Sequence, residues 1–356
     1  MNHAFWAGRR VLVTGHTGFK GSWLSLWLAH AGANVVGYSD GVPTTPSLYE
    51  SAAVGETLSS VVADIRDRDA LHRTFADQRP EVVFHLAAQP LVRRSYVEPA
   101  LTYETNVLGT LNVLEATKAI EDVRAVVVVT TDKVYEHVSS RPYREDDRLG
   151  GTDPYSSSKA CAELVTSAYR TSFFAERGPA VATARAGNVI GGGDWAEDRL
   201  IPDVIAALIA DRELEIRYPQ ATRPWQHVLS PLDGYLMLAE RLWEERGAAK
   251  AWNFGPEPAD SRSVEWVAEQ VAELWGAPLR STTPSGKQPP EAPSLQLDAT
   301  AARTELGWLP RWELESGLRA TVSWYRRHAD GEAARALVTE QIEAYVADRQ
   351  LSAARP

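Results

Sequence analysis

The sequence predicts an α/β protein: a Rossmann-type, doubly wound parallel sheet with a smaller, mixed α/β domain after it. Three observations lead to this prediction. An apolar strand pattern runs into the segment Gly15-x-x-Gly18-x-x-Gly21, and a helix pattern follows. Strand and helix patterns then alternate through the first half of the chain, which is typical of a parallel sheet covered by helices. After about residue 186 this alternation ends, and Pro, Trp and Arg accumulate.

In the first half, the strands are expected at residues 11–14, 34–38, 60–62, 82–86, 125–130 and 181–184. Helices are expected at 22–31, 69–78 and about 99–119. The strand at 125–130 is the most apolar, so we expect it to be buried on both faces. Ligands bind at the carboxyl ends of strands in such sheets, so functional side chains are expected directly after the strands.

The second half shows helix patterns at 200–212, 232–245, 263–275 and 314–327, a short strand at 251–254 and a proline-rich loop at 281–293. We therefore expect residues 1–185 to form a dinucleotide-binding domain, with a returning segment at about 228–250. Residues 186–356 are expected to form mainly the substrate domain.

Composition excludes several classes of function. The net charge of −10 over 356 residues makes a nucleic-acid backbone an unfavourable partner. Cys161 is the only cysteine, so the chain cannot form an internal disulfide, and a cysteine-based metal site is not expected. No stretch approaches the roughly 18 apolar residues of a membrane span. A soluble cytoplasmic protein without a metal is expected.

The glycine-rich turn predicts a site for a dinucleotide. Glycines let the backbone approach a pyrophosphate, and the following helix presents free N–H groups to it. Thr17, Phe19 and Lys20 lie in the same turn. The spacing differs by one residue from the usual G-x-G-x-x-G pattern, so a plain turn is the alternative.

Tyr155 and Lys159 form a Y-x-x-x-K pattern that places both side chains on one face of a helix. An ammonium beside a phenol favours the phenolate and lowers its pKa from about 10 toward neutrality. Such a phenolate can take a proton from a hydroxyl while hydride leaves the same carbon. The alternative is an ordinary tyrosine and a solvated lysine.

Four polar residues, Thr130, Thr131, Asp132 and Lys133, follow the most apolar strand. That position faces the nicotinamide end of a dinucleotide, where Thr131 can hydrogen-bond the reacting hydroxyl. Asp132 and Lys133 offer an acid and a base, which requires a protonated carboxyl and a neutral amine. A loop with a solvated ion pair is the alternative.

Together these motifs resemble the extended short-chain dehydrogenase/reductase family, and within it the CDP-D-glucose 4,6-dehydratases. The Asp-Lys after Thr131 is the most discriminating feature, because related dTDP-glucose dehydratases carry Asp-Glu there and sugar epimerases usually carry small residues. The matching segments span almost the whole chain and lie at residues 14–24, 43–48, 85–96, 130–136, 143–147, 186–195, 221–229 and 252–256.

The resemblance implies a mechanism, a cofactor and an assembly. Tyr155 would take the C4 hydroxyl proton while hydride passes from C4 of a nucleotide sugar to NAD. Lys133 would then remove the C5 proton, Asp132 would protonate the departing C6 hydroxyl, and hydride would return to C6. NAD should stay bound through the cycle. The helix that carries Tyr155 and the helix before Ala119 would form a homodimer contact, with burial inside one subunit as the alternative.

Position also predicts binding residues. Ser39 or Asp40 is placed for the adenosine ribose, where an acid favours NAD over NADP, although Lys20 weakens this preference. Arg199 and Arg223 could clamp the substrate diphosphate, while His227 is as consistent with packing. The remaining expected cofactor contacts are Asp64, Ile65, Leu86, Ala87, Ala88 and Gln89, and the remaining substrate contacts are Gln89, Ser95, Asn188 and Leu200.

Two departures from the family pattern leave the nucleotide and the sugar open. Residues 137–142 read H-V-S-S-R-P where the family has a Trp-containing loop, and residues 290–292 read P-E-A where it has H-E-A. The alternative activity is an NAD-dependent 4-epimerase of a different nucleotide-linked hexose or heptose, which needs neither Asp132 nor Lys133. A non-catalytic dinucleotide-binding regulator is the alternative from another class.

Overall fold

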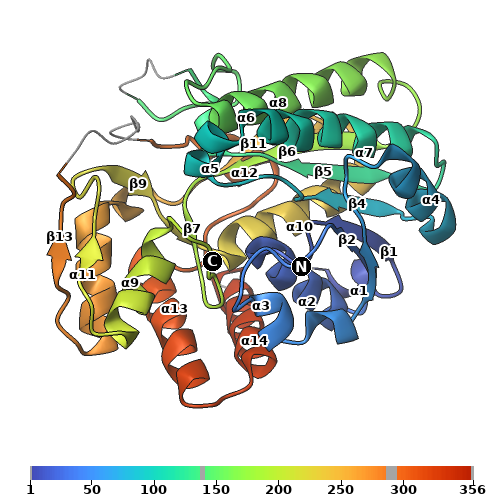
Figure 1. Ribbon diagram of the computed structural model, residues 1–356. Coiled ribbons are helices and arrows are strands. Elements are labelled where there is room, and N and C mark those ends of the chain that lie inside the picture. Colours follow the sequence, from blue (N-terminus) through green and yellow to red (C-terminus); the bar gives the residue numbers. More distant parts are fainter. Residues whose placement is uncertain (1, 137–140, 286–294, 354–356) are drawn as a thin grey trace.

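The computed structural model describes residues 2–136, 141–285 and 295–353, and in these ranges seven parallel strands form one sheet in the order β11-β6-β5-β4-β1-β2-β3 (Figure 1). The strand order reverses between β1 and β4, which is where open α/β sheets bind ligands. The doubly wound fold is therefore confirmed. The strands are β1 (Arg10–Thr14), β2 (Asn34–Ser39), β3 (Ser59–Val62), β4 (Val82–His85), β5 (Ala125–Val129), β6 (Ala180–Ala186) and β11 (Ala251–Phe254).

Helices cover both faces of the sheet, as Figure 1 shows. Alternate side chains of β1 divide between the faces: Val11 and Val13 pack with Trp23 and Trp27, and Leu12 joins a separate core on the other side. One face is covered by α1 (His3–Trp6), α2 (Phe19–His30) and α10 (Leu229–Glu244). The other is covered by α4 (Arg68–Gln78), α6 (Pro99–Tyr103), α7 (Gly109–Lys118) and α8 (Pro154–Ser172).

The second part of the chain lies beside the carboxyl ends of the strands (Figure 1). Its helix α11 (Val264–Trp275) packs between α9 (Leu200–Ile209) and α13 (Leu314–Ala329). Short strand pairs complete it: β7 (Val189–Ile190) with β10 (Gln226–His227), β9 (Thr222–Pro224) with β12 (Ser261–Ser263), and β8 (Leu214–Glu215) with β13 (Ser281–Thr282). No helix in the described ranges combines the length and apolarity needed to span a membrane.

The predicted strands are present, and β5 is buried along its whole length as expected. The helix predicted over 99–119 is divided, because Glu104–Leu108 forms a π turn between α6 and α7. Helix α2 begins at Phe19 rather than Ser22, since Gly18 already serves as its N-cap. Five α-helices of the described ranges were not predicted: α1 (His3–Trp6), α3 (Leu48–Ser51), α5 (Val92–Val97), α12 (Thr300–Glu305) and α14 (Ala334–Ala353). Of the two departures from the family pattern, residues 137–140 of the first and all of the second, at 290–292, lie outside the described residues.

Candidate active site

A cavity of about 640 Å³ opens at the carboxyl ends of the strands, between the sheet and the second part of the chain. Segments that follow β1, β2, β4, β5 and β6 all contribute to its wall. Most residues proposed from the sequence line it: Gly15, Thr17, Gly18, Phe19, Lys20, Gly21, Asp40, Asp64, Ile65, Leu86, Ala87, Ala88, Thr130, Thr131, Asp132, Lys133, Tyr155, Lys159, Asn188, Arg199, Leu200 and Arg223.

The three glycines of the turn have different surroundings. Gly15 has φ of +76°, and a Cβ there would lie 2.7 Å from the Ala87 nitrogen. At Gly21 a Cβ would lie 2.0 Å from the Gly15 oxygen, so these two glycines allow close packing of backbone on backbone. A Cβ at Gly18 would meet only the Gly15 oxygen, at 3.4 Å, beside the N-terminus of α2. The gap that Gly18 leaves fits a pyrophosphate, because free N–H groups face it.

This difference makes Gly18→Val a selective test of cofactor binding. A Cβ there would make only an ordinary contact with the Gly15 oxygen and would enter the gap, so we expect the Kd for NAD to rise by roughly a hundredfold or more, each tenfold costing about 1.4 kcal/mol. Isothermal titration calorimetry measures the Kd. Gly247→Val is the matched control, because Gly247 also has open space around it and lies outside the cavity. Parent-like binding by Gly18→Val would show that the turn does not hold the pyrophosphate.

The structure brings Thr131, Tyr155 and Lys159 together. Helix α8 begins at Pro154 with Asp153 as N-cap, so Tyr155 stands in its first turn. Burial raises the pKa of the Tyr155 phenol, and the Thr131 hydroxyl acts on the phenol in the opposite direction. One turn further on, Lys159 Nζ donates to the Val129 oxygen at 3.1 Å. The phenol and the ammonium therefore border the cavity from one helix face, at the end of β5.

The protonation of this pair differs from the expectation. Burial raises the pKa of Tyr155 to about 12 rather than lowering it toward neutrality. Burial also lowers the pKa of Lys159 to about 8. Both changes have one cause, because each group loses water around its charged form. Lys159 Nζ donates to a backbone carbonyl, and burial is the largest influence on the pKa of the phenol.

Asp132 and Lys133 lie on η3 (Asp132–Val134), directly after Thr131. Asp132 Oδ1 accepts a hydrogen bond from the Thr131 hydroxyl at 3.0 Å. Its other oxygen is buried and finds no hydrogen-bond partner in the described chain. A buried carboxyl oxygen without a partner is costly, so one that borders a cavity is suited to bind a ligand polar group. Lys133 borders the same cavity and is half-buried.

Lys20 lies in the catalytic half of the cavity. The charges that act on it belong to Arg199, Asp132, Lys159 and Asp194, in that order, and burial lowers its pKa to about 8. Asp40, at the end of β2, is not among these groups.

Five arginines of the described residues border the cavity, and three of them, Arg93, Arg199 and Arg217, form ion pairs with Asp194 or Asp198. Arg199 Nη1 forms an ion pair with Asp194 Oδ2 at 2.9 Å, and both residues lie between β7 and α9. Asp198 holds both Arg93, at 2.8 Å, and Arg217, at 2.6 Å. Sequence reasoning missed Arg93, Arg217 and both aspartates, although Arg93 lies in a segment that follows β4 and resembles the family. These guanidinium groups suit a diphosphate, which they can bind through paired N–H donors.

The family assignment follows from sequence comparison. A model of the GDP-mannose 4,6-dehydratase family matches residues 12–321. The chain belongs to this family. A CDP-glucose 4,6-dehydratase of Salmonella typhimurium is 48% identical over 335 residues, covering 92% of this chain and 93% of the relative. A UDP-glucose 4-epimerase of Mycolicibacterium smegmatis is 31% identical over 89% of this chain and 98% of its own.

These dehydratases belong to the extended short-chain dehydrogenases/reductases, and a solved structure of that larger family shares the fold of this chain. The UDP-glucose 4-epimerase of Thermus thermophilus, solved in complex with NAD, superposes with a TM-score of 0.77 at 25% identity. The match covers 89% of this chain and 99% of that chain.

Three residues predicted to bind cofactor or substrate, Gln89, Ser95 and His227, lie outside the cavity wall. The Gln89 side chain donates to the Leu91 oxygen and to Thr102, so it stabilises the loop after β4. Ser95 is fully buried, and its hydroxyl accepts from the Tyr155 nitrogen. His227 packs between Trp23 and Trp312, and burial lowers its pKa to about 3. The structure therefore places these side chains behind the wall rather than in it.

Proposed function

We propose that the protein is an NAD-dependent 4,6-dehydratase that converts CDP-D-glucose to CDP-4-keto-6-deoxy-D-glucose. The observation that carries the proposal is the Asp132–Lys133 pair on η3, in the cavity that Tyr155, Lys159 and Thr131 also border. Its acid and base are needed for dehydration and not for oxidation at C4. The Salmonella relative, named a CDP-glucose 4,6-dehydratase, supports the choice of nucleotide and sugar.

In this proposal the side chains act in sequence. Tyr155 takes the proton of the C4 hydroxyl, and Thr131 hydrogen-bonds that hydroxyl. NAD, which the glycine turn at Gly18 would hold, would supply the reversible hydride transfer between C4 and C6. Lys133 removes the C5 proton, which the C4 ketone has made acidic, and Asp132 protonates the departing C6 hydroxyl. General acid and base groups act best in a site closed to water, and Asp132 is 2% exposed.

Cofactor and substrate would occupy different parts of the cavity. We infer that the turn at Gly18 holds the NAD pyrophosphate, that Asp40 binds the adenosine ribose, and that Asp64 and Ile65 contact the adenine. An acid at Asp40 favours NAD over NADP. The substrate would lie toward Asn188, Leu200 and the arginines, with Arg199 and Arg223 on the diphosphate.

We also propose that different parts of the chain bind the cofactor and the substrate. Residues 1–185, with a returning segment at about 228–250, would bind NAD, and residues 186–356 would mainly bind substrate. The return of the chain through α10 to β11, at the edge of the main sheet, supports this division. The lone Cys161 agrees with a cytoplasmic location, where disulfides are rare.

One assay tests the proposed function. The protein is incubated with CDP-, dTDP-, GDP- and UDP-glucose, and the products are analysed by mass spectrometry. We expect the CDP sugar to lose one water. A product of unchanged mass with inverted C4 would favour the epimerase alternative, and bound NAD without turnover of any of these sugars would favour the regulator.

We also infer that the protein forms a homodimer through α8 and the helices beside it. Large apolar side chains remain exposed there: Leu164 on α8 is 58% exposed, Leu108 on the π turn 53%, and Val97 at the end of α5 81%. Burying such surface stabilises association by roughly 25 cal/mol per Å² before the costs of binding. Multi-angle light scattering at micromolar concentration should give the mass of two chains.

Glutamate at Leu108 and Leu164 together should convert this dimer to monomers, because charge would enter its apolar contact. Ile209→Glu is the matched control, since Ile209 is 57% exposed at the end of α9, away from α8. A monomeric parent would contradict the homodimer.

A further inference from the structure

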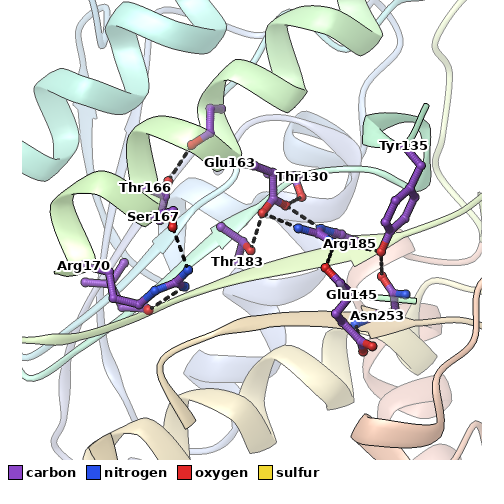
Figure 2. A network of polar contacts seen from close by, with 12 residues as sticks. Thr130, Tyr135, Glu145, Glu163, Thr166, Ser167, Arg170, Thr183, Arg185 and Asn253 are labelled. Atoms are coloured by element: carbon purple, nitrogen blue, oxygen red, sulfur yellow. Dashed lines mark hydrogen bonds and ion pairs between the residues drawn. The ribbon is translucent and has the colours of Figure 1, made fainter. Parts of the chain in front are cut away.

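The catalytic helix carries a buried acid that the mechanism does not use. Glu163 lies one turn beyond Lys159 on α8 and is 4% exposed. Figure 2 shows four donors converging on its carboxylate. Oε1 accepts from the Thr130 hydroxyl and from Arg185 Nε at 2.9 Å. Oε2 accepts from the Thr183 hydroxyl at 2.7 Å and from Arg185 Nη2 at 2.9 Å.

Arg185, on β6, extends the contacts toward the second part of the chain. Its Nη1 donates to the Tyr135 hydroxyl at 2.8 Å and to the Glu145 oxygen at 3.0 Å. The Tyr135 hydroxyl donates in turn to Asn253 Oδ1 on β11 at 2.6 Å. The ion pair thus joins α8, the end of β5, β6 and β11 through buried groups that are fully paired (Figure 2).

Glu163 is connected to both groups of proposed catalytic residues, the segment after β5 and the pair on α8. Thr130, which it holds, directly precedes Thr131, Asp132 and Lys133. Tyr155 and Lys159 stand on the helix from which Glu163 projects. We propose that Glu163 is a positioning residue: its carboxylate fixes the Thr130–Lys133 segment against the catalytic helix and supplies the negative charge that the Lys159 ammonium requires. This inference rests on the proposed function, because it concerns the same Tyr155 and Lys159.

The charges around Lys159 support the second part of the proposal. The groups that act on it are Glu163 on its own helix, His85 on β4 and Lys20 on α2. Burial lowers the pKa of His85 to about 3, so this histidine is neutral, and Lys20 contributes positive charge. Glu163 opposes the effect of burial on Lys159, whose pKa is about 8. Removing its charge should therefore make Lys159 lose its proton at lower pH.

Glu163→Gln tests this effect with an isosteric side chain. We expect the alkaline limb of the pH–rate profile for C4 oxidation to move to lower pH by on the order of one unit. A second readout needs no turnover. NMR of carbon-13-labelled lysine follows the titration of each lysine and gives few signals in this lysine-poor chain. A Lys159→Met variant assigns the Lys159 signal. The titration midpoint of Lys159 should fall by the same amount in the protein with its cofactor bound.

Two further variants separate charge from packing. Glu163→Gln combined with Arg185→Met removes both buried charges. It should restore the fold if the unpaired Arg185 destabilises the single variant. Its alkaline limb should remain shifted to lower pH. Thr183→Val is the matched control, because it removes one hydrogen bond to the same carboxylate and keeps the charge. It should lower the melting temperature without moving the limb.

The proposal would be overturned if all three variants kept the alkaline limb and the Lys159 midpoint of the parent and only their melting temperature fell. Glu163 would then be a core ion pair. Failure of the proposed function looks different. The parent would then convert none of the four nucleotide sugars, while the lysine titration would still report whether Glu163 sets the protonation of Lys159.

Discussion

Lys133→Ala is expected to oxidise the sugar at C4 while releasing little 4-keto-6-deoxy product. The phenol, the ammonium and Thr131 do not depend on the Lys133 side chain, since Thr131 contacts only its backbone nitrogen, at 3.4 Å. Loss of the C5 base should slow dehydration on the order of a hundred- to ten-thousand-fold. The absorbance of reduced nicotinamide measures the first step, and mass spectrometry measures the product.

Isotope exchange sharpens this prediction. Solvent deuterium should enter C5 during turnover by the parent and hardly at all in Lys133→Ala. Lys118→Ala is the matched control, because Lys118 is a surface lysine paired with Glu115 and lies outside the cavity. Parent-like turnover by Lys133→Ala, or release of a C4 epimer by the parent, would replace the dehydratase assignment with the epimerase.

Tyr155→Phe is expected to suppress the earlier step, the oxidation at C4. The substitution removes only the hydroxyl of a residue that borders the cavity, while the ring keeps its place. We expect the rate of nicotinamide reduction to fall on the order of a hundred- to ten-thousand-fold, as for loss of a general base. Stopped-flow absorbance on mixing with the CDP sugar measures this rate.

Binding and fold should survive this change. The affinity for NAD and the melting temperature should remain close to those of the parent. Tyr169→Phe offers a control on the same helix, because the Tyr169 hydroxyl donates to Glu115 away from the cavity. If Tyr155→Phe reduced nicotinamide at the parent rate, another group would be the base at C4.

The sheet and the catalytic motifs could be predicted because local patterns determine them. Apolar runs such as residues 125–129 identify strands by themselves, and Tyr155 and Lys159 share a helix turn at a fixed spacing. Helix α14 is absent from the predicted elements, although Leu337, Val338, Ile342 and Tyr345 recur at helical spacing and are buried. In that case the sequence signal was present and was not used.

Other parts of the site depend on contacts between distant segments. Nothing local to Arg93 indicates that it meets Asp198, and Glu163 and Arg185 pair only because β6 lies beside α8. The raised pKa of Tyr155 is of the same kind, since burial depends on the whole fold and not on the neighbouring lysine. Spacing therefore predicted which residues gather at the strand ends, but not their partners or their protonation.

The way the chain closes its sheet has a consequence for biosynthesis. Strand β11, from residues 251–254, completes the edge beside β6, and α14 packs on α2 near the start of the chain. A nascent chain that has reached residue 186 thus presents β6 without its outer neighbour, and the part of α2 that α14 covers stays exposed until residues 334–353 leave the ribosome. The cofactor turn at the head of α2 acquires its full support late in synthesis, so chaperones are expected to engage this protein while most of the cofactor site is already translated.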